Sequence, residues 1–206
     1  MKLFLVFFIS LLSAGSIHLL SDFYNNDKWQ LKDTSIDNIQ ILETYDADYS
    51  DKFIRIEGSV DNRDSILNTI ESISDYNNIV SNKNISSDFL FSNGDTLFCY
   101  QRISNSIPFI RDRQYIFKMY RVDNSRIDWY LVNENHAALQ PYLKDDVRTL
   151  TYGAGSWKFS DDEKILIYRM YMDEEVNLPL SFIQKLRINY ALNIFNDVIN
   201  WSKGDK

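Results

Sequence analysis

Three β-hairpin patterns in succession, followed by one long helical pattern, are the strongest constraint on the fold of this chain. Each hairpin pattern consists of two β-type runs joined by a short polar turn, and Asn93-Gly94-Asp95 is the clearest turn sequence. The paired runs are 85–91 with 96–103, 115–122 with 127–132, and 147–159 with 165–172. Consecutive hairpins of this kind predict a curved antiparallel sheet.

The last predicted element is a helix that opens at Pro179. Proline suits the first turn of a helix, where its missing N–H needs no partner. Apolar side chains then recur at helical spacing from Phe182 to Trp201 and form a broad stripe. A helix of about twenty-two residues spans roughly 33 Å, which is enough to cross a whole sheet.

The first part of the chain predicts three further strands and a shorter helix. The β-type runs are 29–32, 39–45 and 53–60, and the helical spacing covers Ile66 to Ile73. Asp61, Asn62 and Asp64 are candidate caps for that helix, and a polar loop is expected from Asp75 to Asn84. Strands, a helix, six strands and a long helix define an α+β fold.

The bulk composition is that of one well-filled domain. The chain has 206 residues, of which 45% are hydrophobic, with 13 Tyr and 13 Phe, so it can build a large core or a lined pocket. No repeat or Pro/Gly/Ser-rich linker interrupts it, and we expect a single domain over 21–206.

The first sixteen residues have the pattern of a secretory signal peptide. Lys2 precedes an apolar run of about ten residues and a cluster of small residues. Cleavage is expected after Ala14, Gly15 or Ser16, which makes the protein periplasmic or secreted. The alternative is an uncleaved anchor that extends through Leu20.

Several function classes are disfavoured. A net charge of −7 without a basic stripe opposes binding to nucleic acid. The single cysteine, Cys99, is best explained as a small buried residue, and two histidines, His18 and His136, are too few for an ordinary zinc site. No phosphate-binding loop or nucleophile motif occurs. We therefore expect no catalytic residue, metal or cofactor.

The alternation of side chains along each strand predicts which face of the sheet points inward. Tyr115, Phe117 and Met119 share one face of their strand, and Leu166, Tyr168, Met170 and Met172 share one face of the last strand. In the strand before it, the predicted inward set is Arg148, Leu150, Tyr152 and Ala154. The small residues 153–155 indicate close approach of another element or a ligand.

Two arginines on these inward faces distinguish a cavity from a plainly packed core. A buried guanidinium needs a carboxylate or a polar ligand group, because an unpaired buried charge is costly. Arg113 and Arg148 are therefore predicted either to orient the polar head of a ligand or to form structural ion pairs. Without them, a filled core would be the simpler interpretation.

At these residues the chain resembles the START domains, the lipid-transfer modules of steroidogenic acute regulatory proteins and phosphatidylcholine transfer proteins. In that family a Pro is followed shortly by the sequence Arg-Asp-aromatic at the start of a strand. The sequence PFIRDRQY at 108–115 is similar, with Arg113 at the Arg, Gln114 in place of the Asp and Tyr115 at the aromatic position. Val147-Arg148 with Trp157, and Asn177-Leu178-Pro179 with Asn in place of Gly, are similar to two later motifs. The Trp-Asn/Asp pair expected after the second helix is absent, and Tyr76-Asn77-Asn78 stands there.

The resemblance implies a helix-grip fold that holds one lipid-like molecule in an enclosed tunnel. The last helix and the loop 133–146 would form the gate, and transient membrane contact and a monomeric state are expected. The predicted lining consists of Arg113, Tyr115, Phe117, Met119, Arg148, Leu150, Tyr152, Met170, Met172, Ile183, Leu186 and Tyr190.

Two alternatives remain open at this point. One is an enzyme on the same fold, with His136, Glu134 and inward tyrosines as candidate groups. The other is an interaction or stress protein with a filled core, which a structure lacking a cavity of a few hundred Å³ would favour.

Overall fold

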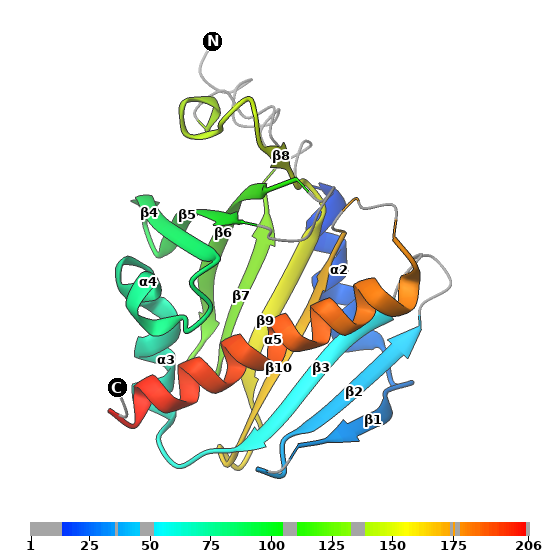
Figure 1. The fold of residues 1–206 in the computed structure, drawn as a ribbon. Coiled ribbons are helices and arrows are strands. Elements are labelled where there is room, and N and C mark those ends of the chain that lie inside the picture. Colours follow the sequence, from blue (N-terminus) through cyan, green and yellow to red (C-terminus); the bar gives the residue numbers. More distant parts are fainter. Residues whose placement is uncertain are drawn as a thin grey trace.

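The computed structural model describes residues 14–35, 37–45, 52–104, 111–132, 139–173, 175 and 178–204. Its centre is a ten-stranded sheet with the order β1-β2-β3-β10-β9-β7-β6-β5-β4 and with β8 beside β6 (Figure 1). The strands are β1 (Gln30–Thr34), β2 (Gln40–Tyr45), β3 (Lys52–Ser59), β4 (Ile85–Asn93), β5 (Thr96–Ile103), β6 (Arg113–Asp123), β7 (Arg126–Leu131), β8 (Arg148–Thr149), β9 (Gly153–Phe159) and β10 (Ile165–Met172). All neighbouring strands are antiparallel except β8, which runs parallel to β6.

The three predicted hairpins are confirmed as β4–β5, β6–β7 and β9–β10. Gly94 has a φ of +60° in the first of these turns, a backbone conformation that glycine adopts without steric cost. The strands β1 to β3 pair with the other edge of the hairpin array through β10. The predicted α+β helix-grip architecture is therefore the observed one.

One long helix, α5 (Leu180–Ser202), crosses one face of the sheet (Figure 1). Pro179 stands at its N-cap position, one residue before the first helical turn. The buried stripe of α5 includes Ala191, Phe195 and Val198, which join the main core together with residues from β3, β9 and β10. Aromatic and aliphatic burial on this face provides most of the driving force for the fold.

Shorter helices close one end of this core. In α3 (Arg63–Glu71) the side chain of Asn62 accepts a hydrogen bond of 3.0 Å from the Ser65 N–H, which confirms one of the predicted caps. The expected polar loop after α3 is wrong in part, because it contains the helical turns η1 (Ile73–Asp75) and α4 (Tyr76–Ile79). This mostly polar stretch contributes three residues to the main core, namely Tyr76, Ile79 and Val80.

The opposite face of the sheet is covered by a helix that the sequence did not suggest. The helix α2 (Ala14–Asn25) buries Leu19, Leu20 and Phe23 against an aromatic cluster that contains Phe53 and Tyr171. The folded part of the chain thus includes residues before the expected domain start at residue 21. Within the described residues, no helix is both long and apolar enough to cross a membrane.

The predicted strand 147–159 is interrupted. The chain forms β8 beside β6, leaves the sheet at residues 150–152, and re-enters it as β9. This interruption reverses the alternation of side chains, so that Leu150 lies in the main core whereas Tyr152 and Ala154 lie in the cluster beneath α2. The predicted common face for these residues is therefore wrong.

Candidate functional site

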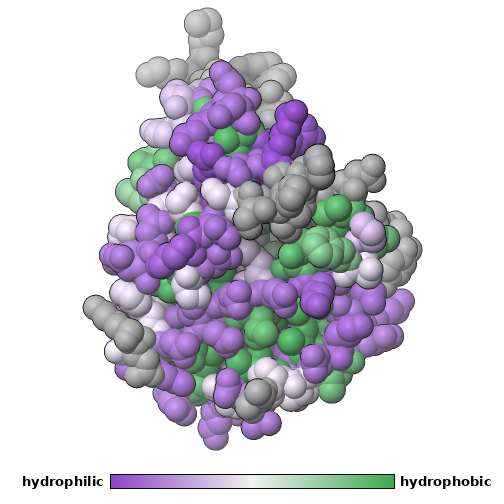
Figure 2. Space-filling view, in the orientation of Figure 1, coloured by the Kyte–Doolittle hydropathy of each residue, from purple (hydrophilic) through white to green (hydrophobic). Residues whose placement is uncertain are grey.

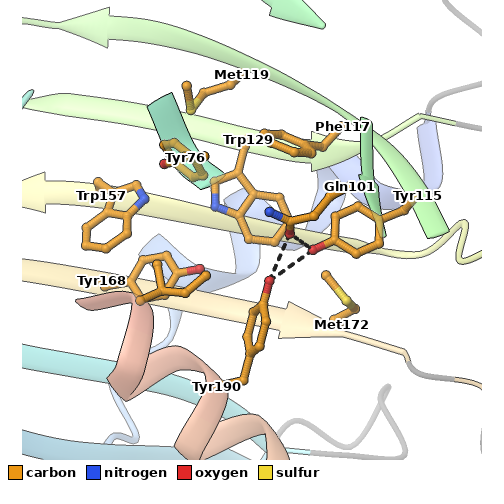
Figure 3. A pocket seen from close by; sticks show the side chains of 11 residues that line it. Tyr76, Gln101, Tyr115, Phe117, Met119, Trp129, Trp157, Tyr168, Met172 and Tyr190 are labelled. Carbon is orange, nitrogen blue, oxygen red and sulfur yellow. Dashed lines mark hydrogen bonds between the residues drawn. The ribbon is translucent and has the colours of Figure 1, made fainter. Parts of the chain in front are cut away.

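A small cavity lies between α5 and the concave face of the sheet (Figure 3). Its volume is about 40 Å³, which holds no more than a few water molecules. The sheet contributes most of the walls, α5 contributes the floor, and α4 contributes one side chain. The lining residues are Tyr76, Gln101, Tyr115, Phe117, Met119, Trp129, Trp157, Tyr168, Met172, Tyr190 and Ile194.

Three polar side chains meet at one end of this cavity. The Tyr190 hydroxyl donates a hydrogen bond of 2.9 Å to Oε1 of Gln101, and the Tyr115 hydroxyl donates to the same oxygen. The two hydroxyl oxygens are 3.1 Å apart. The amide of Gln101 in turn donates a hydrogen bond of 2.6 Å to Oγ of Ser87, which fixes its orientation. We call Gln101, Tyr115 and Tyr190 the polar cluster.

The cavity is electrically neutral. Each described side chain that lines it is uncharged, and burial keeps its phenols protonated. Desolvation raises the pKa of Tyr190 to about 12. Desolvation also raises the pKa values of Tyr76, Tyr115 and Tyr168 well above their usual range. None of these phenols is a base near neutral pH.

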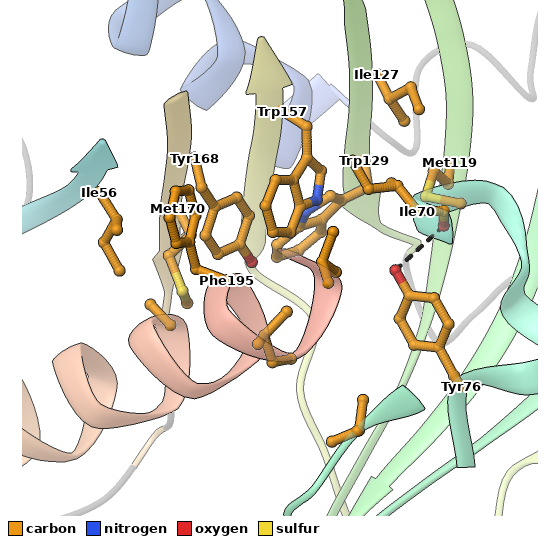
Figure 4. Close-up of a cluster of buried hydrophobic side chains, with 14 of the residues drawn as sticks. Ile56, Ile70, Tyr76, Met119, Ile127, Trp129, Trp157, Tyr168, Met170 and Phe195 are labelled. Carbon is orange, nitrogen blue, oxygen red and sulfur yellow. Dashed lines mark hydrogen bonds between the residues drawn. The ribbon is translucent and has the colours of Figure 1, made fainter. Parts of the chain in front are cut away.

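The other end of the cavity is a wall of stacked aromatic rings (Figure 4). The rings of Trp157 and Tyr168 are stacked at 3.9 Å, and Phe195 of α5 stacks on Trp157 at 6.1 Å. Trp129 lies over Gly155, where an added Cβ would be 2.5 Å from the indole Cζ2 atom. The prediction that residues 153–155 allow a close approach is thus confirmed, and the approaching group is this indole.

Five of the predicted lining residues border the cavity, namely Tyr115, Phe117, Met119, Met172 and Tyr190. Leu150 and Met170 are buried in the core around the cavity but do not line the cavity. Ile183 is buried on α5 and does not line the cavity either. The strand alternation of β6 and β10 was therefore interpreted correctly.

Other predicted lining residues lie elsewhere. Arg148 is 58% exposed and pairs with Glu175 at the surface, so the prediction that it points inward is wrong. Tyr152 lies on the α2 side of the sheet, and Leu186 is 40% exposed on α5. Arg113 is buried, but it donates to the backbone carbonyl of Arg111 and does not border the cavity.

The structure adds six lining residues to that prediction: Tyr76, Gln101, Trp129, Trp157, Tyr168 and Ile194. Tyr168 was already on the predicted inward face and Ile194 in the predicted helical stripe, although neither was among the predicted lining residues. Alternation within β7 could have placed Trp129 inward as well. No sequence signal marked Tyr76, because the segment around it is polar. Gln101 is a polar residue on a buried face, which pattern alone does not reveal.

Other sequence candidates fall outside this site. Glu134, His136 and the Pro108 end of the strand-start motif lie outside the described residues. Cys99 is fully buried, and desolvation raises the pKa of its thiol to about 12, which confirms its interpretation as a core residue. Within the described residues, no group of His, Cys, Asp or Glu side chains could hold a metal ion.

The two halves of α5 are packed differently. In the C-terminal half, Ala191, Phe195 and Val198 are almost completely buried. In the N-terminal half, Leu180, Phe182 and Leu186 are 58%, 41% and 40% exposed, and apolar surface is visible at this end of the helix (Figure 2). Among the residues that the structure describes, no side chain caps the N-terminus of α5. The N-terminal half is therefore the less firmly held part of the wall over the cavity.

Solved structures with a similar fold are known. The StAR-related lipid transfer protein from Xanthomonas axonopodis superimposes with a TM-score of 0.70 at 12% identity, over 86% of this chain and 99% of that one. Human StAR-related lipid transfer protein 5 superimposes with a TM-score of 0.68 at 10% identity, over 91% and 93% of the two chains. The di-domain aromatase/cyclase StfQ from the steffimycin biosynthetic pathway gives 0.51 at 8% identity, over 74% of this chain and 52% of that one.

Sequence comparisons give no such match. No known family profile matches the chain. No curated protein matches it at a significant level. At these identities the structural similarity establishes the fold, and the resemblance predicted from the sequence is confirmed at that level. This chain has the helix-grip fold of the StAR-related lipid transfer domains.

Proposed function

We propose that this protein binds one neutral hydrophobic molecule between its sheet and α5. The observation that carries this proposal is the lining of the cavity, which combines an uncharged aromatic surface with one buried polar cluster. Ligand sites are mostly apolar with a few placed polar groups that fix orientation. The solved relatives are named lipid transfer proteins, which supports a lipid-like ligand.

The chemistry of the lining favours a neutral ligand over a charged one. A charge transferred into this cavity would lose its hydration and meet no ion partner. A hydroxyl or amide group could exchange hydrogen bonds with Tyr190 while Gln101 keeps its bond to Tyr115. The predicted head-group role of Arg113 and Arg148 is not part of this proposal, because neither borders the cavity.

Uptake requires the cavity to expand, since about 40 Å³ is far below the size of a lipid. The exposed N-terminal half of α5 is the part of the wall that we expect to move. Its displacement would break the two bonds of Tyr190 to the sheet and leave the buried C-terminal half as an anchor. The apolar surface at Leu180, Phe182 and Leu186 would give this moving end a transient membrane contact.

Native mass spectrometry with extraction of bound molecules tests the proposal. A panel of long-chain alcohols, monoacylglycerols, sterols and fatty acids would compare neutral with charged ligands of similar size. We expect Met172→Trp, which fills the cavity, to abolish binding, whereas Val122→Trp on an exposed strand end should retain it. The proposal would be contradicted if no molecule co-purified with the protein and no member of the panel bound.

A second candidate is a non-binding interaction protein. The cavity volume favours it, because a space of about 40 Å³ amounts to a nearly filled core. The two candidates differ in the response to ligands: a filled core predicts no change in thermal stability with any member of the panel, whereas a bound ligand raises the melting temperature.

We propose that the protein is a carrier rather than an enzyme. StfQ shows that this fold also occurs in an aromatase/cyclase, so catalysis needs a separate test. The raised phenol pKa values support a carrier, because a protonated tyrosine is a poor general base. Recovery of a chemically altered ligand after incubation would contradict this assignment.

Export is the remaining part of the proposal. The signal pattern of residues 1–16 supports it, and cleavage after Ala14, Gly15 or Ser16 would leave Leu19, Leu20 and Phe23 on the sheet. N-terminal sequencing of the protein recovered from its host would decide between cleavage and an uncleaved anchor.

A further inference from the structure

A groove between the N-terminal half of α5 and the strands β1 to β3 has a different chemistry from the central cavity. Its volume is about 590 Å³, within the range of small-molecule sites. It is bordered by Lys32, Asp33, Ile41, Glu43, Lys52, Leu180, Ser181, Gln184, Lys185, Ile188 and Asn189. Figure 2 shows apolar surface beneath the polar row of α5 on this side of the molecule.

The floor of the groove is apolar. Ile41 is 4% exposed on β2, and Ile188 of α5 packs against the main core from the other side. Leu180, which is 58% exposed, extends this apolar strip toward the beginning of α5. Because Ile41 is almost completely buried, a molecule that contacts it must enter the groove.

The rim carries an excess of positive charge. Glu43 is 5% exposed, and its carboxylate is compensated by Lys52 at 3.0 Å and by the amide of Gln184 at 3.2 Å. The other charged residues that border the groove are Lys32, Lys185 and Asp33. Among the described residues that border it, the groove thus has one unbalanced positive charge, in a chain whose net charge is −7. Such a local reversal of sign attracts an anion.

We propose that this groove is a second binding site, for a single-chain anionic amphiphile such as a free carboxylate with an alkyl tail. Its tail lies on Ile41, Ile188 and Leu180, where burial of each CH₂ group favours binding. Its head group lies between Lys32 and Lys185. The site is separate from the central cavity. It selects an anionic head group, whereas the central cavity is proposed to bind a neutral ligand.

Calorimetric titration with decanoate tests this proposal, with decanol and decyltrimethylammonium as neutral and cationic probes of equal chain length. We expect decanoate to bind at least fivefold more tightly than either, and its affinity to fall with added salt because the rim is exposed. Lys32→Glu with Lys185→Glu should weaken decanoate at least fivefold and strengthen the cationic probe. The matched control, Lys164→Glu with Lys203→Glu, makes the same charge change away from the groove and should leave binding unchanged.

Location is tested by amide NMR shifts during the same titration. Shifts centred on Gln184, Lys185 and Asn189 support the groove, and Met172→Trp in the central cavity should leave them intact. Equal binding of the three probes, unchanged affinity in the groove double variant, or shifts centred on Gln101 would each overturn the proposal. So would binding to vesicles of anionic lipid combined with no binding of free decanoate.

Discussion

The hydroxyl of Tyr190, on α5, donates a 2.9 Å hydrogen bond to Oε1 of Gln101, on β5. This bond links the helix that covers the cavity to the sheet that forms its walls. The same oxygen also accepts from Tyr115, so Gln101 remains satisfied if Tyr190 moves away. The helix can therefore separate from the sheet without leaving an unpaired buried acceptor.

Replacing this tyrosine tests the link. We expect Tyr190→Phe to lower the free energy of unfolding by about 1 kcal/mol, since a neutral hydrogen bond contributes about that much. Exchange of any bound ligand should become faster, because α5 loses its bonds to the sheet. Chemical denaturation and a ligand-release assay measure the two effects. Tyr142→Phe, at a 40% exposed position, is the control and should change neither.

The close contact at Gly155 predicts a steric limit. Gly155→Ala would place a methyl group 2.5 Å from Cζ2 of the Trp129 ring and should cost about 2–3 kcal/mol through overpacking. Gly58→Ala should cost less, because its methyl group would lie 3.0 Å from the edge of the Phe195 ring. Urea denaturation of both variants provides the comparison. Equal losses would show that the indole moves aside freely.

Two arginines under α2 should respond in opposite ways to the same substitution. Arg169 is 7% exposed, and within the described residues its Nε and Nη1 atoms have no hydrogen-bond partner. Burial lowers the pKa of Arg169, and the neighbouring Arg55 lowers it further. Arg169→Met should therefore leave the free energy of unfolding unchanged or raise it.

Arg126→Met is the matched variant on β7, which is separated from the strand of Arg169 by β9. Arg126 pairs with the buried carboxylate of Asp128, whose side chain is 1% exposed. Removal of the guanidinium leaves that charge unpaired and should cost about 3 kcal/mol. A loss of similar size in both variants, measured by denaturation, would contradict the assignment of Arg169 as a buried charge with incomplete hydrogen bonding.

The helix α2 is predicted to be an integral part of the fold. Phe23 is 1% exposed, and its ring meets that of Phe53 edge to face at 5.1 Å. Phe23→Ala should cost about 3–4 kcal/mol, as expected for a buried phenylalanine. Phe89→Ala, at a 45% exposed position on β4, should cost under about 1 kcal/mol. A negligible loss for Phe23→Ala would show that α2 is not held on the sheet.

Alkaline pH should destabilise the protein through its buried phenols. Desolvation raises the pKa values of Tyr24 and Tyr190 to about 12 from an ordinary value of 10.0. Above pH 10 the unfolded chain releases these protons first, so the stability they contribute is complete below pH 10 and is lost between pH 10 and 12. Melting temperatures recorded from pH 8 to 11.5 should fall in that interval. The fall should be shallower in Tyr190→Phe, and an unchanged slope would count against this origin.

The alternation of side chains along β6 and β10 and the helical stripe of α5 were determined by the sequence alone. These periodic patterns follow from local backbone geometry, so Tyr115, Met172 and Tyr190 could be placed on the inner surface without a structure. The order of hairpins and the terminal helix also follows from local signals, and it predicts the helix-grip fold.

Only the tertiary structure decided how far the cavity is filled and where the charges lie. Because strand pairing is interrupted after β8, Tyr152 lies on the opposite face of the sheet. Arg148 lies at the surface, where it pairs with Glu175. Long-range contacts, which strand and helix periods do not encode, brought Tyr76 and Gln101 to the same cavity. Cavity volume depends on how bulky rings such as Trp129 and Trp157 interlock across strands, because packing is a property of the assembled core.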